Sequence, residues 1–180
     1  MANILLAASA SVAIYKSCDL ASKLTQDGHK VRALLTRSAA KLISPQLFEA
    51  VSGEPSYTDE FSSERHGAMD HIELARWGAC LVVAPCTADL IARLALGLAD
   101  DVVTTTALAL SASKPRLLCP AMNPDMLAAA PIRRPLETLQ GDGWSVLQPE
   151  AGRMACGAEG QGRLPEPPAI AAWIAKALPR

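Results

Sequence analysis

The sequence predicts an α/β protein, a single domain in which helices cover both faces of a parallel β-sheet. Short apolar runs alternate with helical patterns along the chain, which is typical of strands joined by helical crossovers. Hydrophobic residues make up 50% and charged residues 19% of the sequence, a balance that suits strands buried on both faces. The length of 180 residues fits one core, so we expect residues 1–180 to form one domain.

Local patterns predict the individual elements in order. The apolar run that begins at Ile4 is strand-sized, and after it Leu20 and Leu24 recur at helical spacing. Gly28 then stands where a helix C-cap is expected. The same reasoning predicts strands over residues 4–8, 31–35, 81–84, 116–119 and 144–147, and helices over residues 11–26, 45–51, 87–98, 102–110 and 168–178.

Two segments have no clear periodicity. Residues 52–65 are polar and predict an exposed excursion, and residues 149–168 are rich in Gly and Pro, which predicts a loop able to move. The strand and helix order predicts a Rossmann-like or flavodoxin-like three-layer sandwich. In such a fold, ligands bind where the loops diverge beyond the carboxyl ends of the strands.

Charge and cysteine content exclude several classes of partner. Lys and Arg number 17 against 18 Asp and Glu, so we expect no nucleic-acid or membrane partner. The apolar N-terminus has no basic flank, and no apolar run approaches the roughly 18 residues of a membrane span. Five cysteines without a C-x-x-C pair argue against disulfides and structural zinc, and no metal site is expected. We therefore expect a cytoplasmic protein.

Three of the strand-end loops carry hydroxyl groups that could hold a phosphate. Ser9, Ala10 and Ser11 follow the first strand, where hydroxyls and helix N-terminal N–H groups favour anions. Capping of the next helix by Ser9 or Ser11 is the competing interpretation, and a G-x-G-x-x-G pattern is missing there. Further hydroxyls and polar groups follow the second and third strands, at Thr36, Arg37, Ser38, Thr87 and Asp89.

Three side chains distant in the sequence are candidates for chemistry. His71 stands near a helix start, and an imidazole side chain can transfer protons at neutral pH, although a single histidine in such a position is more often structural or solvent-exposed. Asn123, beside Met122 and between two prolines, can donate to a carboxylate in a desolvated site, or it can be a helix N-cap. Cys156 stands among four glycines in residues 152–163, which indicates either a thiol-bearing lid or a surface loop with an incidental cysteine.

Six segments together resemble the flavoprotein family of homo-oligomeric FMN-containing cysteine decarboxylases. The resemblance covers nearly the whole chain and is closest to the branch that acts on phosphopantothenoylcysteine in coenzyme A biosynthesis. The segments are ASASVAIYK at residues 8–16, MDHIEL at 69–74, APCTADLIA at 84–92, GLADD at 97–101, PAMN at 120–123 and ACGAEGQGR at 155–163. Each segment alone is unspecific, but their order along the chain is specific.

The resemblance implies an enzyme that converts 4'-phosphopantothenoylcysteine to 4'-phosphopantetheine. It implies a homo-oligomer, a trimer or a multiple of trimers, with FMN between subunits. His71 would assist oxidation of the substrate thiol to a thioaldehyde, Asn123 and Met122 would bind the substrate and its carboxylate, and Cys156 would donate a proton when the ene-thiolate is reduced. The implied FMN contacts are Ser9, Ala10, Ser11, Thr36, Ser38, Pro85, Cys86, Thr87, Ala88 and Ala121.

Other functions remain open at this point. A peptidyl-cysteine decarboxylase that makes C-terminal enethiols on ribosomal peptides would not need the proton from Cys156. A non-catalytic regulatory flavoprotein, a flavin prenyltransferase and a nucleotide-binding module without flavin could share the fold. Many bacterial relatives fuse this domain to a synthetase, so a chain ending at Arg180 is expected to be a stand-alone decarboxylase or a truncated one.

Overall fold

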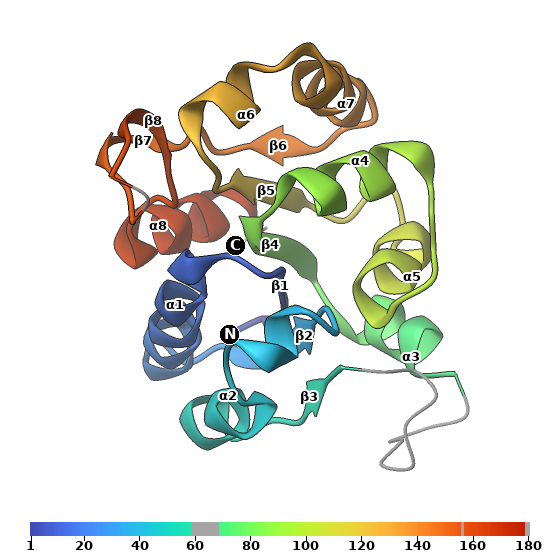
Figure 1. The fold of residues 1–180 in the computed structure, drawn as a ribbon. Helices are drawn as coiled ribbons and strands as arrows, with labels where there is room; N and C mark the ends of the chain where they lie inside the picture. Colours follow the sequence, from blue (N-terminus) through green and yellow to red (C-terminus); the bar gives the residue numbers. More distant parts are fainter. Residues whose placement is uncertain (59–68, 156, 179–180) are drawn as a thin grey trace.

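A six-stranded parallel sheet forms the centre of the molecule (Figure 1). The computed structural model describes residues 1–58, 69–155 and 157–178. The strand order is β3-β2-β1-β4-β5-β6, with every neighbouring pair parallel. The strands are β1 (Asn3–Ala8), β2 (Lys30–Leu35), β3 (Ser56–Tyr57), β4 (Cys80–Cys86), β5 (Arg116–Pro120) and β6 (Ser145–Val146). The predicted α/β fold class is confirmed.

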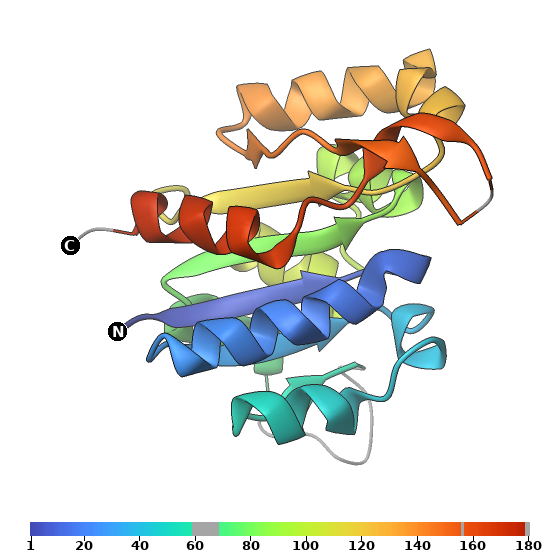
Figure 2. The same cartoon turned by 90° about the vertical axis from the view of Figure 1, so that its left-hand side faces the viewer.

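Helices cover both faces of the sheet (Figure 2). Helices α1 (Tyr15–Gln26), α2 (Pro45–Ser52) and α8 (Pro167–Ala177) pack on one face. The opposite face carries α3 (Asp70–Trp77), α4 (Ala88–Leu96), α5 (Val102–Ala109) and α7 (Ala130–Gly141). The short elements are the 3-10 helices η1 (Val12–Ile14) and η2 (Ala39–Lys41) and helix α6 (Pro124–Ala128).

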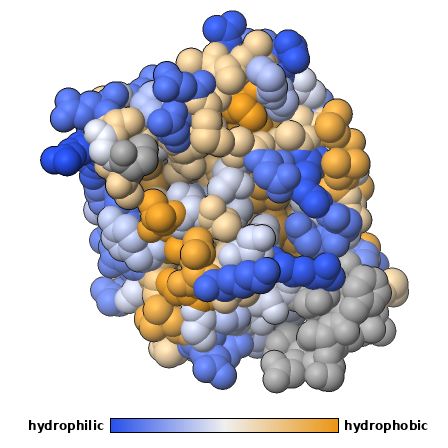
Figure 3. All heavy atoms as spheres, in the orientation of Figure 1, coloured by the Kyte–Doolittle hydropathy of each residue, from blue (hydrophilic) through white to orange (hydrophobic). Residues whose placement is uncertain are grey.

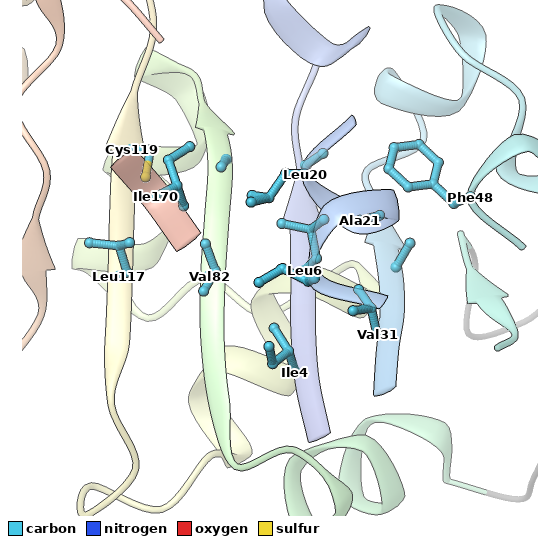
Figure 4. Packing of buried hydrophobic residues seen from close by; sticks show 14 of the residues in the cluster. Ile4, Leu6, Leu20, Ala21, Val31, Phe48, Val82, Leu117, Cys119 and Ile170 are labelled. Atoms are coloured by element: carbon cyan, nitrogen blue, oxygen red, sulfur yellow. The ribbon is translucent and has the colours of Figure 1, made fainter. Parts of the chain in front are cut away.

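Alternation of side chains along the strands divides the core into two layers. In β1, Ile4 and Leu6 pack in the layer that contains Leu20 of α1 (Figure 4), whereas Leu5 faces the layer that contains Leu90 of α4. All five side chains are 1% exposed or less. Full burial of one such side chain stabilises the fold by about 1.5–3 kcal/mol. The strands are therefore held from both sides, which fixes the positions of the loops at their ends.

The carboxyl ends of the strands meet at one edge of the sheet, which faces the viewer in Figure 1. Strand β1 lies between β2 and β4, and the helices that follow β1 and β4 pack on opposite faces. The loops after β1 and β4 therefore diverge, and this is the place where open parallel sheets bind ligands.

The structure differs from the sequence-based prediction in two places near this edge. The expected helix over residues 11–26 begins as the short turn η1 and continues as α1. The expected loop over residues 149–168 was wrong in part, because an antiparallel hairpin of β7 (Glu150–Arg153) and β8 (Glu159–Arg163) forms there. Its strands consist of Gly, Ala and polar or charged residues, so the hairpin lacks the hydrophobic alternation that reveals a strand.

Three further elements were not expected. The short strand β3 lies inside the polar excursion over residues 52–65, of which residues 59–65 lie outside the described part of the chain. Helix α6 begins at Pro124, inside the segment of residues 120–126, and α7 follows it. Pro131 occupies the first turn of α7, where a missing N–H costs nothing, but Pro135 lies inside the helix. The second proline obscured the helical pattern in the sequence.

Candidate active site

A cavity of about 590 Å³ lies at the carboxyl ends of β1, β2 and β4. Its volume falls within the roughly 300–1,000 Å³ of small-molecule sites. Six of the ten expected cofactor residues line it: Ser9, Ala10, Thr36, Ser38, Thr87 and Ala88. The remaining lining residues are Arg37, Asp89, Leu90, Arg93, Asp100, Asp101 and Met126. The loops after three parallel strands thus meet around one space, as the sequence predicts.

Ser9 joins two of these loops. Its side chain is 2% exposed, and its Oγ donates to the carbonyl of Pro85 at 2.9 Å and accepts from the N–H of Thr87 at 2.9 Å. The backbone N–H of Ser9 also donates to the Pro85 carbonyl, at 3.0 Å. Ser9 is therefore a link between the ends of β1 and β4, and it does not cap a helix.

Ser11 and Thr87 both stand at the start of a helix, but only the Ser11 side chain makes a capping hydrogen bond. Ser11 caps η1, because its Oγ accepts from the N–H of Ala13 at 3.3 Å. Thr87 occupies the N-cap position of α4 without making a side-chain cap bond, and it lines the cavity. The nine-residue helix α4 thus directs its N-terminus toward the cavity. Helix N-terminal N–H groups and hydroxyls suit a phosphate or a polyol.

Arg93 forms an ion-pair network at the wall of this cavity. Its guanidinium contacts Asp89 with an Nε–Oδ2 distance of 3.2 Å and forms a two-fold contact with the carboxylate of Asp100. The hydrogen bond from Arg93 lowers the pKa of Asp100. We did not expect Arg93 or Asp100 from the sequence, although the i, i+4 spacing of Asp89 and Arg93 on a helix was visible.

A second cavity of about 550 Å³ lies between the start of α1, the loop after β5 and the β7–β8 hairpin. Ser9 and Ala10 line the first cavity and Ser11 lines the second, so the two are neighbours. Four expected site residues line the second cavity: Ser11, Ala121, Met122 and Asn123. The others are Val12, Ala13, Tyr15, Lys16, Arg153, Met154, Ala155, Gly162, Arg163 and Leu164.

Asn123 both caps a helix and lines the second cavity. Its Oδ1 accepts from the N–H groups of Asp125 at 2.8 Å and Met126 at 3.4 Å, at the start of α6. These two bonds fix the orientation of the amide plane and leave Nδ2 with its two N–H donors. The two interpretations of Asn123 from the sequence are therefore compatible, since one end of the amide caps α6 while the other can bind an anion.

The hairpin packs closely against the loop that carries Asn123. The N–H of Met122 donates to the carbonyl of Gly162 at 3.1 Å. A Cβ atom at position 162 would lie 2.1 Å from the carbonyl oxygen of Met122 and 3.0 Å from the sulfur of Met154. Only glycine permits this approach, so Gly162 fixes the hairpin beside Asn123.

Lys16 ties the first turns of α1 to the segment before α8. Its Nζ donates to the carbonyl of Leu164 at 3.0 Å and to Oε1 of Glu166 at 2.7 Å. The hydrogen bond from Lys16 lowers the pKa of Glu166. Lys16 is 7% exposed, so this ion pair holds a buried ammonium at the edge of the second cavity.

Three expected site residues are placed elsewhere, and a fourth lies outside the described residues. Pro85 and Cys86 line neither cavity, since both are buried in β4. The side chain of Cys86 packs in the core, and burial raises the pKa of its thiol well above the usual value. The expected contact of Cys86 with the cofactor stays a prediction. His71 is half-buried in the first turn of α3 and is absent from the described linings of both cavities. Cys156 lies outside the described residues, although Ala155 before it lines the second cavity.

The described residues show neither a metal-ligand cluster nor a membrane span. No group of three or more His, Cys, Asp or Glu side chains comes together in the described part of the chain. Among the same residues, no helix is long and apolar enough to cross a bilayer. The thiols of Cys18, Cys80, Cys86 and Cys119 are free, and burial raises the pKa of Cys80 to about 12.

Comparison with known proteins gives the same family as the sequence segments. The family model described as Flavoprotein matches residues 1–178. The coenzyme A biosynthesis bifunctional protein CoaBC of Bacillus subtilis is 42% identical over 92% of this chain. The match covers 40% of that relative, so the chain spans about two fifths of its length.

Two solved structures share the fold and are each 31% identical in sequence to this chain. A cysteine-to-serine mutant of PPC decarboxylase, complexed with pantothenoylaminoethenethiol, has a TM-score of 0.86 and 31% identity, and 97% of each chain is covered. The FMN binding protein AtHal3 has a TM-score of 0.82 and 31% identity, with coverage of 97% of this chain and 95% of that one. From the family match over almost its full length and from these relatives, the chain belongs to the Flavoprotein family.

Proposed function

We propose that this chain binds FMN in the first cavity and decarboxylates 4'-phosphopantothenoylcysteine to 4'-phosphopantetheine in the second. The observation that carries the proposal is the pair of neighbouring cavities at one sheet edge, which are lined by eight of the ten expected cofactor residues and by Asn123. The curated CoaBC relative and the PPC decarboxylase structure support the choice of reaction.

The first cavity fits a flavin mononucleotide. Thr87, Ser38 and the N-terminus of α4 offer donors for a phosphate, and Ser9 holds the two flanking loops together. When bound, FMN supplies the two-electron oxidation and the later reduction that make loss of CO2 possible. The protein supplies placement, exclusion of water and protons.

In the second cavity, Asn123 positions the substrate carboxylate. Its Nδ2 donates to one carboxylate oxygen, while Met122 and Met154 give the site an apolar wall. Two N–H donors of a neutral amide orient the carboxylate without the strong charge stabilisation that would oppose its loss as CO2. Cys156 donates the proton that completes the product when the two electrons taken from the substrate thiol are returned to the ene-thiolate, so the substrate loses CO2 with no net oxidation.

We further propose that the working site forms between copies of this chain, in a trimer or a multiple of trimers. His71 is absent from the described linings of both cavities of its own chain, so in this proposal it acts on the substrate of a neighbouring copy. Exposed hydrophobic residues gather near η1 and α2 and at the end of α4 on the face shown in Figure 3. Val12 and Tyr15, 71% and 64% exposed, lie at the second cavity and suit burial by that copy.

The alternative product is an enethiol, as a peptidyl-cysteine decarboxylase would release. The presence of Cys156 favours the saturated product, because only that product requires the final proton. Purified protein loaded with FMN is incubated with phosphopantothenoylcysteine, and the products are identified by mass. We expect 4'-phosphopantetheine from the wild type and accumulation of the enethiol from Cys156→Ser. A wild type that releases the enethiol, or that leaves the substrate intact, contradicts the proposal.

A further inference from the structure

The charged side chains of the second cavity have no part in the chemistry described above. Arg153 on β7 and Arg163 on β8 line this cavity together with Lys16, and these are the only charged side chains among its described lining residues. All three are basic. The first cavity, in contrast, carries two arginines and three aspartates, Arg37, Asp89, Arg93, Asp100 and Asp101, which sum to one negative charge. The second cavity therefore attracts anions more strongly than the first.

Two glycines fix the position of the Arg163 guanidinium. Gly162, the residue before it, is in backbone contact with Met122, so the start of the Arg163 side chain is held beside the Asn123 loop. A Cβ atom at position 152 would lie 2.8 Å from Nη1 of Arg163, so Gly152 leaves the space in which the side chain crosses the hairpin. Glu166 contacts Nη2 of Arg163 at 3.4 Å while also pairing with Lys16. One carboxylate thus faces two cations there, and Arg153 is a third cation in the lining of the same cavity.

These arginines do not suit the reacting carboxylate. A guanidinium on that group would stabilise its negative charge in the ground state, and this charge is lost in the transition state, so the barrier would rise. They suit a second anion that takes no part in bond breaking. A phosphate monoester carries almost two charges at neutral pH and matches the planar donors of guanidinium.

We propose that Arg153 and Arg163 form a phosphate-monoester subsite that selects phosphorylated substrates over dephosphorylated ones and over peptides. The choice of ligand rests on the proposed function, in which the substrate carries its phosphate at the far end of a flexible pantothenoyl arm from the carboxylate. The cavity volume of about 550 Å³ is sufficient for an elongated ligand of this size.

Binding of a non-reactive ligand tests the subsite without depending on decarboxylation. Calorimetry compares 4'-phosphopantothenate with pantothenate, which both lack the cysteine, on the FMN-loaded protein. We expect the wild type to bind the phosphorylated ligand at least about tenfold tighter, and Arg153→Gln or Arg163→Gln to reduce that preference about tenfold. Arg153→Lys, which keeps the charge, should retain most of the preference. Arg134→Gln on the exposed side of α7 is the matched control and should retain all of it.

The outcomes separate this inference from the proposed function. An Arg-dependent preference for the phosphorylated ligand supports the subsite even if phosphopantothenoylcysteine is not decarboxylated. A wild type without preference, or folded Arg153→Gln and Arg163→Gln variants that keep it, overturns the subsite. Release of FMN from both variants, seen in the visible spectrum, together with an unchanged ligand preference, would mean that the arginines hold the cofactor phosphate, and this also overturns the inference.

Discussion

Ser9, Ser11 and Thr87 show how the same kind of side chain takes three roles at one sheet edge. Ser11 caps η1, Ser9 links the ends of β1 and β4, and Thr87 keeps its hydroxyl out of the helix cap. Each stands between a strand and a helix, so their local sequences look alike. The difference arises from burial and from the partner loop, which is 76 residues away for Ser9. The residue types therefore indicate the site, but only the fold assigns the roles.

Ser9→Ala tests the link between the two loops. The variant loses two hydrogen bonds and leaves the Pro85 carbonyl and the Thr87 N–H with one partner fewer in a buried position. We expect the free energy of unfolding to fall by about 1–3 kcal/mol and FMN affinity to fall with it, since both loops line the cofactor cavity. Urea unfolding and fluorescence titration with FMN measure the two effects.

Ser22→Ala is the control for that experiment. Ser22 lies on α1, and its Oγ accepts from Nε2 of the exposed Gln26 side chain at 3.2 Å. The change should shift the free energy of unfolding by no more than about 0.5 kcal/mol. If Ser9→Ala behaves like this control in both measurements, the loop link does not support the cavity.

At the scale of elements, the sequence predicts a strand or helix correctly where burial imposes a periodic pattern of apolar residues. The strands and most helices follow from apolar runs and helical spacing, and the loops of the candidate site follow from their position after parallel strands. The β7–β8 hairpin and α7 were missed, because Gly, Gln and an internal Pro hide the elements from these patterns. Arg153 and Arg163 were missed as site residues for the same reason, since they lie on that hairpin.

The ion pair between Lys16 and Glu166 joins α1 to the segment before α8, and its strength should depend on pH. The pKa of Glu166 is lower in the folded state than the unfolded value of about 4.3. Its contribution is therefore present above about pH 4.3 and is lost as the pH falls through the folded pKa. We expect Glu166→Gln to lower the free energy of unfolding by about 1 kcal/mol at pH 7. The difference from wild type should vanish in acid.

Urea unfolding at a series of pH values measures this dependence. Glu159→Gln, which removes an exposed carboxylate on β8, is the control and should show a smaller effect at pH 7. The exposure of Glu166, 50% for its side chain, limits the size of the effect through screening by solvent. A difference between Glu166→Gln and wild type that is the same at all pH values would contradict the assignment.

At the scale of the whole molecule, one chain provides the two neighbouring cavities and the amide of Asn123, but the imidazole of His71 lies on another element. Asn123 lines the second cavity, while His71 belongs to α3 and to neither described lining. The proposed reaction therefore requires an oligomer, in which His71 of one copy would lie beside Asn123 of another around the same FMN. Exposed apolar side chains at Val12 and Tyr15 provide a surface for that contact.

Mixing two inactive variants tests whether His71 and Asn123 of one site come from different copies. His71→Asn removes the imidazole, and Asn123→Asp keeps an oxygen to cap α6 while its charge repels the substrate carboxylate. We expect each variant alone to bind FMN, assemble and fail to release CO2 from phosphopantothenoylcysteine. Co-expressed at equal amounts, they should recover about a quarter of the wild-type sites, because a shared site then draws both intact residues from different copies. Mixed assemblies that are as inactive as their parents would contradict the account.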